Sequence, residues 1–428
     1  MLYAQNSITQ VGVKTDDWRE AYRDLIPRLP LYVQDAKLTI CGLCTCVDGY
    51  VRLHEAESLL NASEGTPPAA LGRELFRRAS AGIGGEFHMD WPEGGTWVER
   101  NLRISRWGVG GSGAQAAQML AILGAPALMS LEDRGQRQLS VIHPNILVAT
   151  GEGVAKCGEL SAAPGERSAH YIFEFTAGTQ VGSVVLRRSS RTIVRFGDER
   201  LDNDPGFARE SIAAAADAGA GILSGFNEIG EPTMDESLKA TVALAQAWRA
   251  RGLKTIHLEI GDYGTVDARN RVLSHLGGVV NSLGMSQSEL GGFSAGSRDT
   301  IGKACELAEI LNLSRLCVHS DTWALTITKG DPRLELEALL CGCLLASVRA
   351  EKGFPSRPVE LPAAAEFHPL SWEKFSNAGE RSVVSCAAPY LERPAGTIGL
   401  GDTFLAGTLL VLGGAGRAKT NVRTETYL

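Results

Sequence analysis

Residues 394–407 read PAGTIGLGDTFLAG and place one acidic side chain, Asp402, between a run of small residues and an apolar stretch. A helix that begins near Asp402 would direct the amides of residues 399–401 outward, because the first turn of a helix has no internal acceptors. Such a helix end attracts anions, and glycine lets a ligand approach the backbone closely. Taken alone, the stretch favours a simple helix cap by Asp402, since a short glycine loop is a weak signal.

The composition indicates a globular protein without a nucleic-acid or membrane partner. The chain has 428 residues, of which 44% are hydrophobic and 21% charged; its length suggests roughly two or three structural units. A net charge of -7 without a Lys/Arg run argues against nucleic-acid binding. The first twenty residues lack an apolar signal segment, and no apolar run reaches membrane-spanning length. We therefore expect a cytoplasmic protein, with no sequence signal for a particular oligomeric state.

The cysteines predict packing rather than disulfides or a metal centre. There are nine of them, an odd number without a secretory signal, and we expect them to be reduced. Cys41, Cys44 and Cys46 lie in KLTICGLCTCVDGY, an apolar run typical of a buried strand, and a fourth ligand is not evident nearby. Cys341 and Cys343 lie in a helical pattern, where a thiol also packs as a small apolar group.

Short apolar runs alternate along the chain with amphipathic stretches. Strands are predicted at 37–47 and within GILSGF, KTIHLEI, GVVNSLG, RLCVHS and RSVVSCAA. Helices are predicted at 113–124, 208–219, 232–251, 265–276, 299–312 and 331–352. This alternation predicts an α/β fold with a mostly parallel sheet covered on both faces, which binds ligands beyond the carboxyl ends of its strands.

Two stretches break the alternation and predict a second, smaller domain. Residues 49–106 look mixed and loop-rich, while HYIFEF, GSVVLR and RTIVRF within 168–196 look like antiparallel strands. We expect these two insertions to form a lid on a large domain built from 1–48, 107–167 and 197–428. A lid excludes water, which would otherwise spoil reactions such as phosphoryl transfer.

Polar side chains follow three predicted strands of the large domain. KTIHLEIGD places His257 and Glu259 on the same face of a strand end, NSLGMSQSEL offers Glu289, and LCVHSDTW offers His319. A lone histidine in an apolar run is usually a satisfied core residue, but successive strand ends meet at one edge of a parallel sheet. Two carboxylates without cysteine partners suit Mg²⁺, held largely through water beside phosphates.

Taken in order, these motifs resemble the ADP-dependent glucokinase and phosphofructokinase family of the ribokinase-like kinases. The resemblance is carried by GLGD (399–402), HLE (257–259), GMSQSEL (284–290), the double glycine 110–111, HYIFEF (170–175) and the Asp48 of CTCVDGY. It spans residues 37–410 and implies a three-layer α/β/α domain with a smaller β-rich lid. It also implies a kinase that transfers the terminal phosphoryl group of ADP to a hexose and releases AMP; the preference for ADP rests wholly on the resemblance.

The resemblance implies a role for each motif residue. Asp402 would be the general base toward the sugar hydroxyl, and the amides of Gly399, Leu400 and Gly401 would form the anion hole. Glu259 and Glu289 would position Mg²⁺ and its waters, with His257 in support. The residues that would grip the sugar are Asp48, Glu86, Gly111, Ser112 and His170. Arg191 would lie on the nucleotide side and take part in catalysis. His319, Asn227 and Thr397 would bind the nucleotide.

The chain also departs from the family's pattern. The family's Asn-x-x-Glu motif reads Ser286-Gln287-Ser288-Glu289, Cys46 stands where an Asn usually helps to hold the sugar, and Ser112 replaces an Asn or Gln. The change at Ser286 would remove an amide that supports the metal, whereas the changes at Cys46 and Ser112 would each weaken sugar selection by about 1 kcal/mol or more. These departures leave a non-catalytic nucleotide or sugar sensor as an alternative, although the intact GLGD loop argues against it.

Glu86, in GIGGEFHMD, stands where the glucokinase members of the family carry Glu and the phosphofructokinase members a small residue. A buried carboxylate would bind neutral sugar hydroxyls and repel a sugar phosphate. The expected acceptor is therefore an unphosphorylated hexose such as glucose. The open alternatives are fructose 6-phosphate or a nucleoside, which would need a basic pocket or an aromatic clamp near Glu86.

Overall fold

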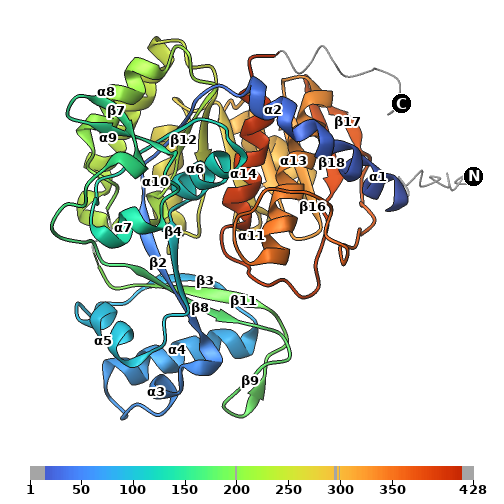
Figure 1. Ribbon diagram of the computed structural model, residues 1–428. Coiled ribbons are helices and arrows are strands. Elements are labelled where there is room, and N and C mark those ends of the chain that lie inside the picture. The colour runs from blue at the N-terminus through green and yellow to red at the C-terminus, as the bar shows by residue number, and fades with distance from the viewer. Residues whose placement is uncertain (1–14, 198–199, 294–295, 298, 417–428) are drawn as a thin grey trace, which may run out of the picture.

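The computed structural model describes residues 15–197, 200–293, 296–297 and 299–416, which form a large α/β part and a smaller part below it in Figure 1. The large part is built on an 11-stranded sheet. In spatial order its strands are β17 (Phe375–Ala378), β18 (Arg381–Ala387), β16 (Trp323–Thr328), β15 (Arg315–His319), β14 (Ser282–Ser286), β13 (Ile256–Glu259), β12 (Ala220–Leu223), β1 (Thr39–Cys41), β5 (Ala127–Met129), β6 (Leu147–Thr150) and β7 (Gly153–Lys156). The strands from β15 to β6 run parallel, and antiparallel strands extend both edges.

Helices cover both faces of this sheet. One face carries α1 (Thr15–Leu25), α2 (Leu29–Asp35), α6 (Ser112–Leu123), α13 (Pro332–Lys352) and α14 (Leu400–Leu412). The other carries α8 (Pro205–Ala214), α9 (Glu231–Ala250), α10 (Val266–Leu276) and α12 (Thr300–Ile310). Successive strand residues serve the two cores in turn, as when Ile222 packs with the first group and Leu223 with the second. The predicted α/β class with a mostly parallel sheet is confirmed.

The smaller part is a mixed five-stranded sheet backed by helices. Its strands, in spatial order, are β3 (Gly85–His88), β11 (Ser190–Arg195), β8 (His170–Phe175), β2 (Cys46–Arg52) and β4 (Arg106–Gly110). α3 (Glu57–Leu60), α4 (Pro67–Ala81) and α5 (Gly94–Asn101) pack on it around an apolar core of their own. A short hairpin, β9 (Gln180–Val181) and β10 (Val184–Val185), projects from it, and α7 (Gln136–Val141) and α11 (Gln287–Gly291) complete the helices.

The structure corrects three expectations about single elements. Residues 49–106 are not loop-rich, because α3, α4 and α5 occupy much of that range. The run 37–47 is not one strand: β1 belongs to the large sheet and β2 to the small one, so the chain changes sheet between Cys41 and Cys46. The strand expected within GVVNSLG begins only at Ser282, since Val279 and Val280 lie in the buried turn before it. HYIFEF and RTIVRF do pair antiparallel, as β8 and β11.

Glycines bring α13 and α14 into backbone contact beneath the GLGD loop. A Cβ atom added at Gly407 would lie 2.7 Å from the Cα of Gly342, and one added at Gly342 would lie 2.6 Å from the Phe404 ring. Real Cβ contacts essentially never come so close. The position of the α14 N-terminus, and hence of Asp402, therefore depends on the absence of side chains at this crossing.

We predict that Gly407→Ala lowers the melting temperature. Alanine favours an exposed helix by roughly 1 kcal/mol over glycine, but here the methyl group would meet the backbone of α13 and overpacking costs about 1–3 kcal/mol. Thermal unfolding of the two proteins measures the difference. Gly291→Ala is the matched control, because a Cβ there meets nothing within 4 Å. An unchanged or higher melting temperature for Gly407→Ala would contradict the close crossing.

Candidate active site

The predicted strand-end residues meet at the carboxyl edge of the large sheet. Glu259 ends β13, His319 ends β15, and Glu289 lies in α11 directly after β14. The three strands are parallel neighbours, so their ends share one edge. The Nε2 atom of His319 lies 3.8 Å from Oε1 of Glu259. The structure therefore gathers an imidazole and two carboxylates at the edge where parallel sheets bind ligands.

His257 is fully buried and holds Glu259 from behind. Its Nε2 lies 2.9 Å from Oε2 of Glu259 and its Nδ1 lies 2.8 Å from the Ser282 hydroxyl, so both ring nitrogens are engaged. Burial lowers the pKa of His257 below its usual 6.5. Burial alone would raise the pKa of Glu259, but His257 and His319 lower it to about 2. We therefore place His257 as a support for Glu259 and not among groups that touch a metal.

Glu289 and Ser286 form a capping box at the start of α11. The Ser286 amide donates to Oε2 of Glu289 at 2.6 Å, and the Glu289 amide donates to the Ser286 hydroxyl at 3.3 Å. The serine that replaces the expected asparagine is thus used as a helix cap. Burial raises the pKa of Glu289 to about 7, and the Glu259 carboxylate adds to this effect.

The chemistry of this pair suits a hard cation. Glu259 is buried and Glu289 half-buried, their carboxylates repel each other, and their cost of ionisation would fall beside a divalent ion. Among the described residues, the one group of three ligand atoms close enough for direct chelation lies elsewhere. Glu259 and Glu289 therefore fit Mg²⁺ held mostly through water, as that ion prefers.

Asp402 lies in the first turn of α14, as predicted. Gly399 is the N-cap and adopts a φ of 68°, which glycine permits. Burial raises the pKa of Asp402, while the charge of Arg349 and a hydrogen bond from Ser112 oppose that rise. Gly401 packs against His319, since a Cβ there would lie 3.1 Å from the ring. The helix start therefore joins the strand-end cluster directly.

Arg349 and Gln115 complete this helix start, and sequence reasoning missed both. Arg349 donates to the Thr403 hydroxyl at 2.9 Å and to the side-chain oxygen of Gln115. A Cβ added at Gly399 would fall 2.2 Å from the Arg349 guanidinium. A buried positive charge thus stands directly behind the amides of residues 399–401 and strengthens their attraction for anions. Arg349 lies inside α13, where the sequence shows only an apolar helical pattern.

The residues predicted to grip a sugar lie on the small sheet and the double glycine. Asp48 on β2 is the register neighbour of His170 on β8. A Cβ at Gly110 would lie 2.2 Å from Oδ1 of Asp48, and Gly111 has a φ of 89° that brings it against the Cys44 carbonyl. Ser112 follows at the start of α6 and reaches Asp402. The double glycine therefore links the small sheet to the base candidate.

Asn227, which was assigned to the nucleotide side, contacts a residue that was assigned to the sugar. Its Nδ2 donates to Oε1 of Glu86, on β3 of the small sheet. Its side chain also lies against Gly261, where a Cβ would approach within 2.6 Å. Asn227 is therefore a partner of the proposed sugar residue Glu86, and its assignment to the nucleotide side stays a prediction.

Arg191 and Thr397 flank the helix start less closely. Arg191 lies on β11 of the small sheet, and its positive charge lowers the pKa of Asp402. Its Nε atom is buried without a hydrogen-bond partner among the described residues. Thr397 is half-buried two residues before Gly399. Arg191 thus belongs with the Asp402 group, whereas burial alone does not assign Thr397.

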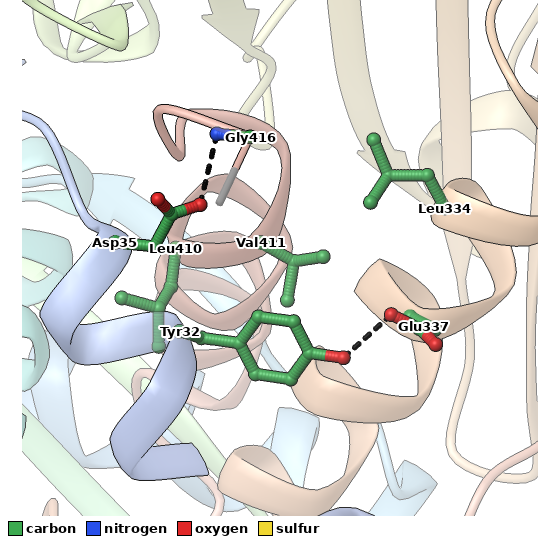
Figure 2. Close-up of a pocket in the computed structure, with 7 residues that line it drawn as sticks. All are labelled: Tyr32, Asp35, Leu334, Glu337, Leu410, Val411 and Gly416. Atoms are coloured by element: carbon green, nitrogen blue, oxygen red, sulfur yellow. Dashed lines mark hydrogen bonds between the residues drawn. The ribbon is translucent and has the colours of Figure 1, made fainter. Parts of the chain in front are cut away.

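Figure 2 shows a separate small pocket at the far end of α14. It is lined by Tyr32, Asp35, Leu334, Glu337, Leu410, Val411 and Gly416. The Tyr32 hydroxyl donates to Glu337 at 2.5 Å, and the Gly416 amide donates to Asp35 at 2.9 Å. These contacts connect α2 to α13 and to the end of α14, so we interpret the pocket as a gap in helix packing.

No helix in the described ranges is long and apolar enough to cross a membrane.

The chain is similar over most of its length to ADP-specific sugar kinases. Residues 39–411 match the ADP-specific Phosphofructokinase/Glucokinase conserved region. The ADP-specific phosphofructokinase of Thermococcus zilligii is 25% identical over 361 residues, which cover 73% of this chain and 78% of that protein. The corresponding enzyme of Thermococcus litoralis is 25% identical over 365 residues, 74% of this chain and 79% of its own.

Solved structures share the fold. An ADP-dependent kinase in complex with fructose 6-phosphate and ADPβS superposes with a TM-score of 0.78 at 17% identity, covering 96% of this chain and 100% of that one. A hypothetical ADP-dependent phosphofructokinase from Pyrococcus horikoshii OT3 gives a TM-score of 0.71 at 18% identity, with 89% and 98% covered.

We predict opposite pKa shifts for the two clustered histidines in magnesium-free protein. Burial would lower the pKa of His319, but the Glu259 carboxylate raises it above 6.5, whereas burial keeps that of His257 below 6.5. Since the folded pKa of His319 exceeds its unfolded value, its stabilising contribution is present below the unfolded pKa and is lost as pH rises through the folded one. NMR titration of the imidazole resonances measures both values.

The His319→Gln variant assigns the signals, because it removes one resonance and leaves the buried pair of His257 and Ser282 in place. Its melting temperature should fall below that of the wild type at pH 6 more than at alkaline pH. A His319 resonance that titrates at lower pH than that of His257 would contradict the electrostatics of the cluster.

Proposed function

Since the chain belongs to the ADP-specific phosphofructokinase/glucokinase family and is an ADP-dependent sugar kinase of ribokinase-like fold, we propose that it phosphorylates an unphosphorylated hexose, with Asp402 as the base. The observation that most supports the proposal is the position of the half-buried Asp402 in the first turn of α14, within electrostatic reach of Arg349 and Glu259. Glucose, giving glucose 6-phosphate and AMP, is the acceptor we put first.

In this mechanism Asp402 accepts the proton of the sugar hydroxyl as the oxygen attacks the terminal phosphoryl group. A pKa raised by burial makes the carboxylate a stronger base, and the Arg349 charge helps to keep it ionised. The amides of residues 399–401, with Arg349 behind them and Arg191 opposite, would stabilise the negative charge that spreads over the phosphoryl oxygens. Mg²⁺ bound near Glu259 and Glu289 would supply further neutralisation of the phosphates.

We predict that Asp402→Asn reduces kcat roughly 100- to 10,000-fold, the usual contribution of a general base, while ADP affinity changes little. A coupled assay of AMP release gives kcat, and titration calorimetry gives ADP affinity. Asp35→Asn is the control: Asp35 ends α2 near the C-terminal end of α14, where it accepts from the Gly416 amide, and this variant should retain activity. Full activity of Asp402→Asn would remove Asp402 as the base.

The charge around Glu86 supports a neutral acceptor. Glu86 accepts a hydrogen bond from Asn227, and Oδ2 of Asp262 would lie 2.6 Å from a Cβ placed on the adjacent Gly85. Two carboxylates at this edge would repel the dianion of a sugar phosphate, whereas sugar hydroxyls can donate to them. The second candidate acceptor is fructose 6-phosphate. The similarity of the chain to two ADP-specific phosphofructokinases supports this alternative.

We predict a higher kcat/KM with glucose than with fructose 6-phosphate in the wild type. Glu86→Ala should lower kcat/KM for glucose roughly 10- to 100-fold, since hydrogen bonds to a charged group contribute about 1.5–3 kcal/mol, and should raise the relative rate with fructose 6-phosphate. Steady-state assays with ADP and ATP against a sugar panel measure this, with the exposed Glu93→Ala as control.

Three outcomes of these assays separate the alternatives. Preference for fructose 6-phosphate in the wild type would establish the second candidate in place of the first. Binding of ADP and sugar by calorimetry without turnover of any pair would indicate a sensor of the same fold. An ATP preference would contradict the assignment of the donor.

A further inference from the structure

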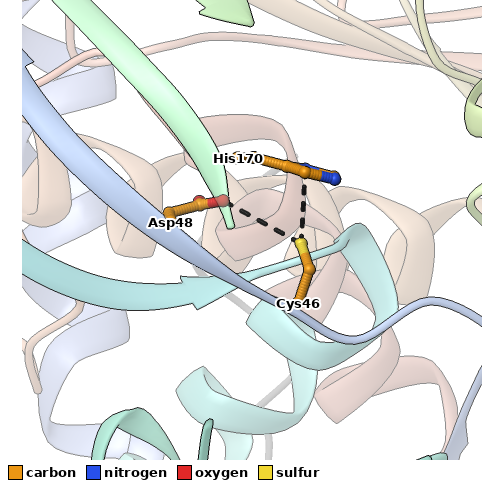
Figure 3. Close-up of side chains that lie close together, drawn as sticks. All are labelled: Cys46, Asp48 and His170. Carbon is orange, nitrogen blue, oxygen red and sulfur yellow. Dashed lines mark hydrogen bonds between the residues drawn. The ribbon is translucent and has the colours of Figure 1, made fainter. Parts of the chain in front are cut away.

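A thiol, a carboxylate and an imidazole converge on the face of the small sheet (Figure 3). Cys46 and Asp48 are two residues apart on β2, so their side chains leave the strand on the same side. His170 begins the neighbouring strand β8, in register with Asp48. The three side chains therefore come from two paired strands, which hold their ligand atoms more rigidly than loops would.

The spacing of these atoms is that of a metal site. The Cys46 sulfur lies 3.4 Å from Nδ1 of His170 and 3.9 Å from Oδ1 of Asp48. All three ligand atoms lie within 4.8 Å of one another. A tetrahedral ion with a metal–sulfur bond of about 2.3 Å and a metal–nitrogen bond of about 2.0 Å separates these two ligand atoms by roughly 3.5 Å. The ligands could close on an ion without a change in the sheet.

The chemistry of the set selects the ion. Thiolate and imidazole are soft and borderline ligands that favour Zn²⁺ over Mg²⁺, whereas Glu259 and Glu289 offer only oxygen. Cys46 and Asp48 are 7% and 3% exposed and His170 is half-buried, so an ion bound there would be shielded from much of the solvent. Gly110 packs on Cys46 and Asp48, since a Cβ added to Gly110 would lie 2.6 Å from the Cys46 sulfur and 2.2 Å from the Asp48 carboxylate.

We propose that Cys46, Asp48 and His170 bind Zn²⁺ through three protein ligands, with the fourth position open, and that this ion excludes the sugar. The second half of the inference rests on the proposed function, which assigns Asp48 and His170 to the sugar. Binding replaces the proton of the Cys46 thiol, which leaves to solvent, and occupies the carboxylate oxygen and ring nitrogen that would otherwise meet sugar hydroxyls. Zn²⁺ therefore acts as a competitive inhibitor that is distinct from the activating Mg²⁺.

Titration of the purified full-length protein with Co²⁺ tests the site without turnover. Co²⁺ replaces Zn²⁺ in such sites, and a thiolate ligand produces a sulfur-to-cobalt charge-transfer band, which Zn²⁺ should then abolish by displacement. We expect the band in the wild type and its loss in Cys46→Ser, with Zn²⁺ affinity at least tenfold weaker by calorimetry. His170→Gln should weaken Zn²⁺ binding while the sulfur band shifts or fades.

The matched control is Cys305→Ser. Cys305 on α12 is half-buried, whereas the other cysteines among the described residues are buried, so its thiol is the one outside the proposed site that an added metal ion would reach most readily. Its cobalt spectrum should equal that of the wild type. A charge-transfer band that survives in Cys46→Ser, that is unchanged in His170→Gln, or that is absent from the folded wild type would overturn the site. Unchanged melting temperatures in the absence of metal identify variants that remain folded.

Inhibition is measured separately, with free Zn²⁺ buffered at fixed levels in excess Mg²⁺. We expect the apparent KM for the sugar to rise with Zn²⁺ in the wild type and in Cys305→Ser, at constant kcat, and to rise at least tenfold less in Cys46→Ser. A cobalt site without kinase activity would leave the metal inference standing while the proposed function fails. Zn²⁺ inhibition that is identical in Cys46→Ser would contradict the inference while the kinase assignment stands.

Discussion

The site depends on how closely the backbone can approach at the glycines around the start of α14. Gly407 lets this helix touch α13 at Gly342, and Gly399 leaves room for the Arg349 guanidinium directly behind the loop. Any side chain at these positions would move the helix start by about the width of a methyl group. Because Asp402 lies in that first turn, its distance from the strand ends depends on this backbone packing as well as on the hydrogen bonds of Arg349.

Repulsion between neighbouring carboxylates is the second constraint on the site. Glu259 is buried, Glu289 and Asp402 are half-buried, and the charge of Glu259 raises the pKa of both; each of the three carboxylates is stabilised differently. Glu259 has two imidazoles, Asp402 has Arg349 and a serine hydroxyl, and Glu289 has chiefly the amide of its own capping box. Glu289 has the fewest cationic partners of the three carboxylates and would therefore be stabilised most by an added cation. The pair of Glu259 and Glu289 is also the set of oxygen ligands expected to hold Mg²⁺.

The sequence predicted the elements whose signals are local. Alternating apolar runs located the parallel strands, and the rule that ligands bind at strand ends identified Glu259, Glu289 and His319 as neighbours. The sequence did not reveal contacts between distant segments of the chain. Arg349 was hidden inside an apolar helix, because periodicity does not reveal what a buried cation contacts. The change of sheet between Cys41 and Cys46 was missed because both short strands are apolar, and the contact of Asn227 with Glu86 was missed because a loop's partner is set by long-range packing.

The departures from the family's pattern are each used by this fold. Ser286 caps α11 and holds Glu289, while Ser112 donates to Asp402, so neither position leaves an unpaired polar group. Cys46 instead faces His170 and Asp48, where an amide would offer hydrogen bonds to a sugar and a thiol offers a metal ligand. The end of the site that would handle the phosphoryl group retains its anion-binding loop and carboxylates. The end that would select the acceptor differs at Cys46, and the end that would hold the metal differs at Ser286, so the divergence of this chain reaches both ends of the site.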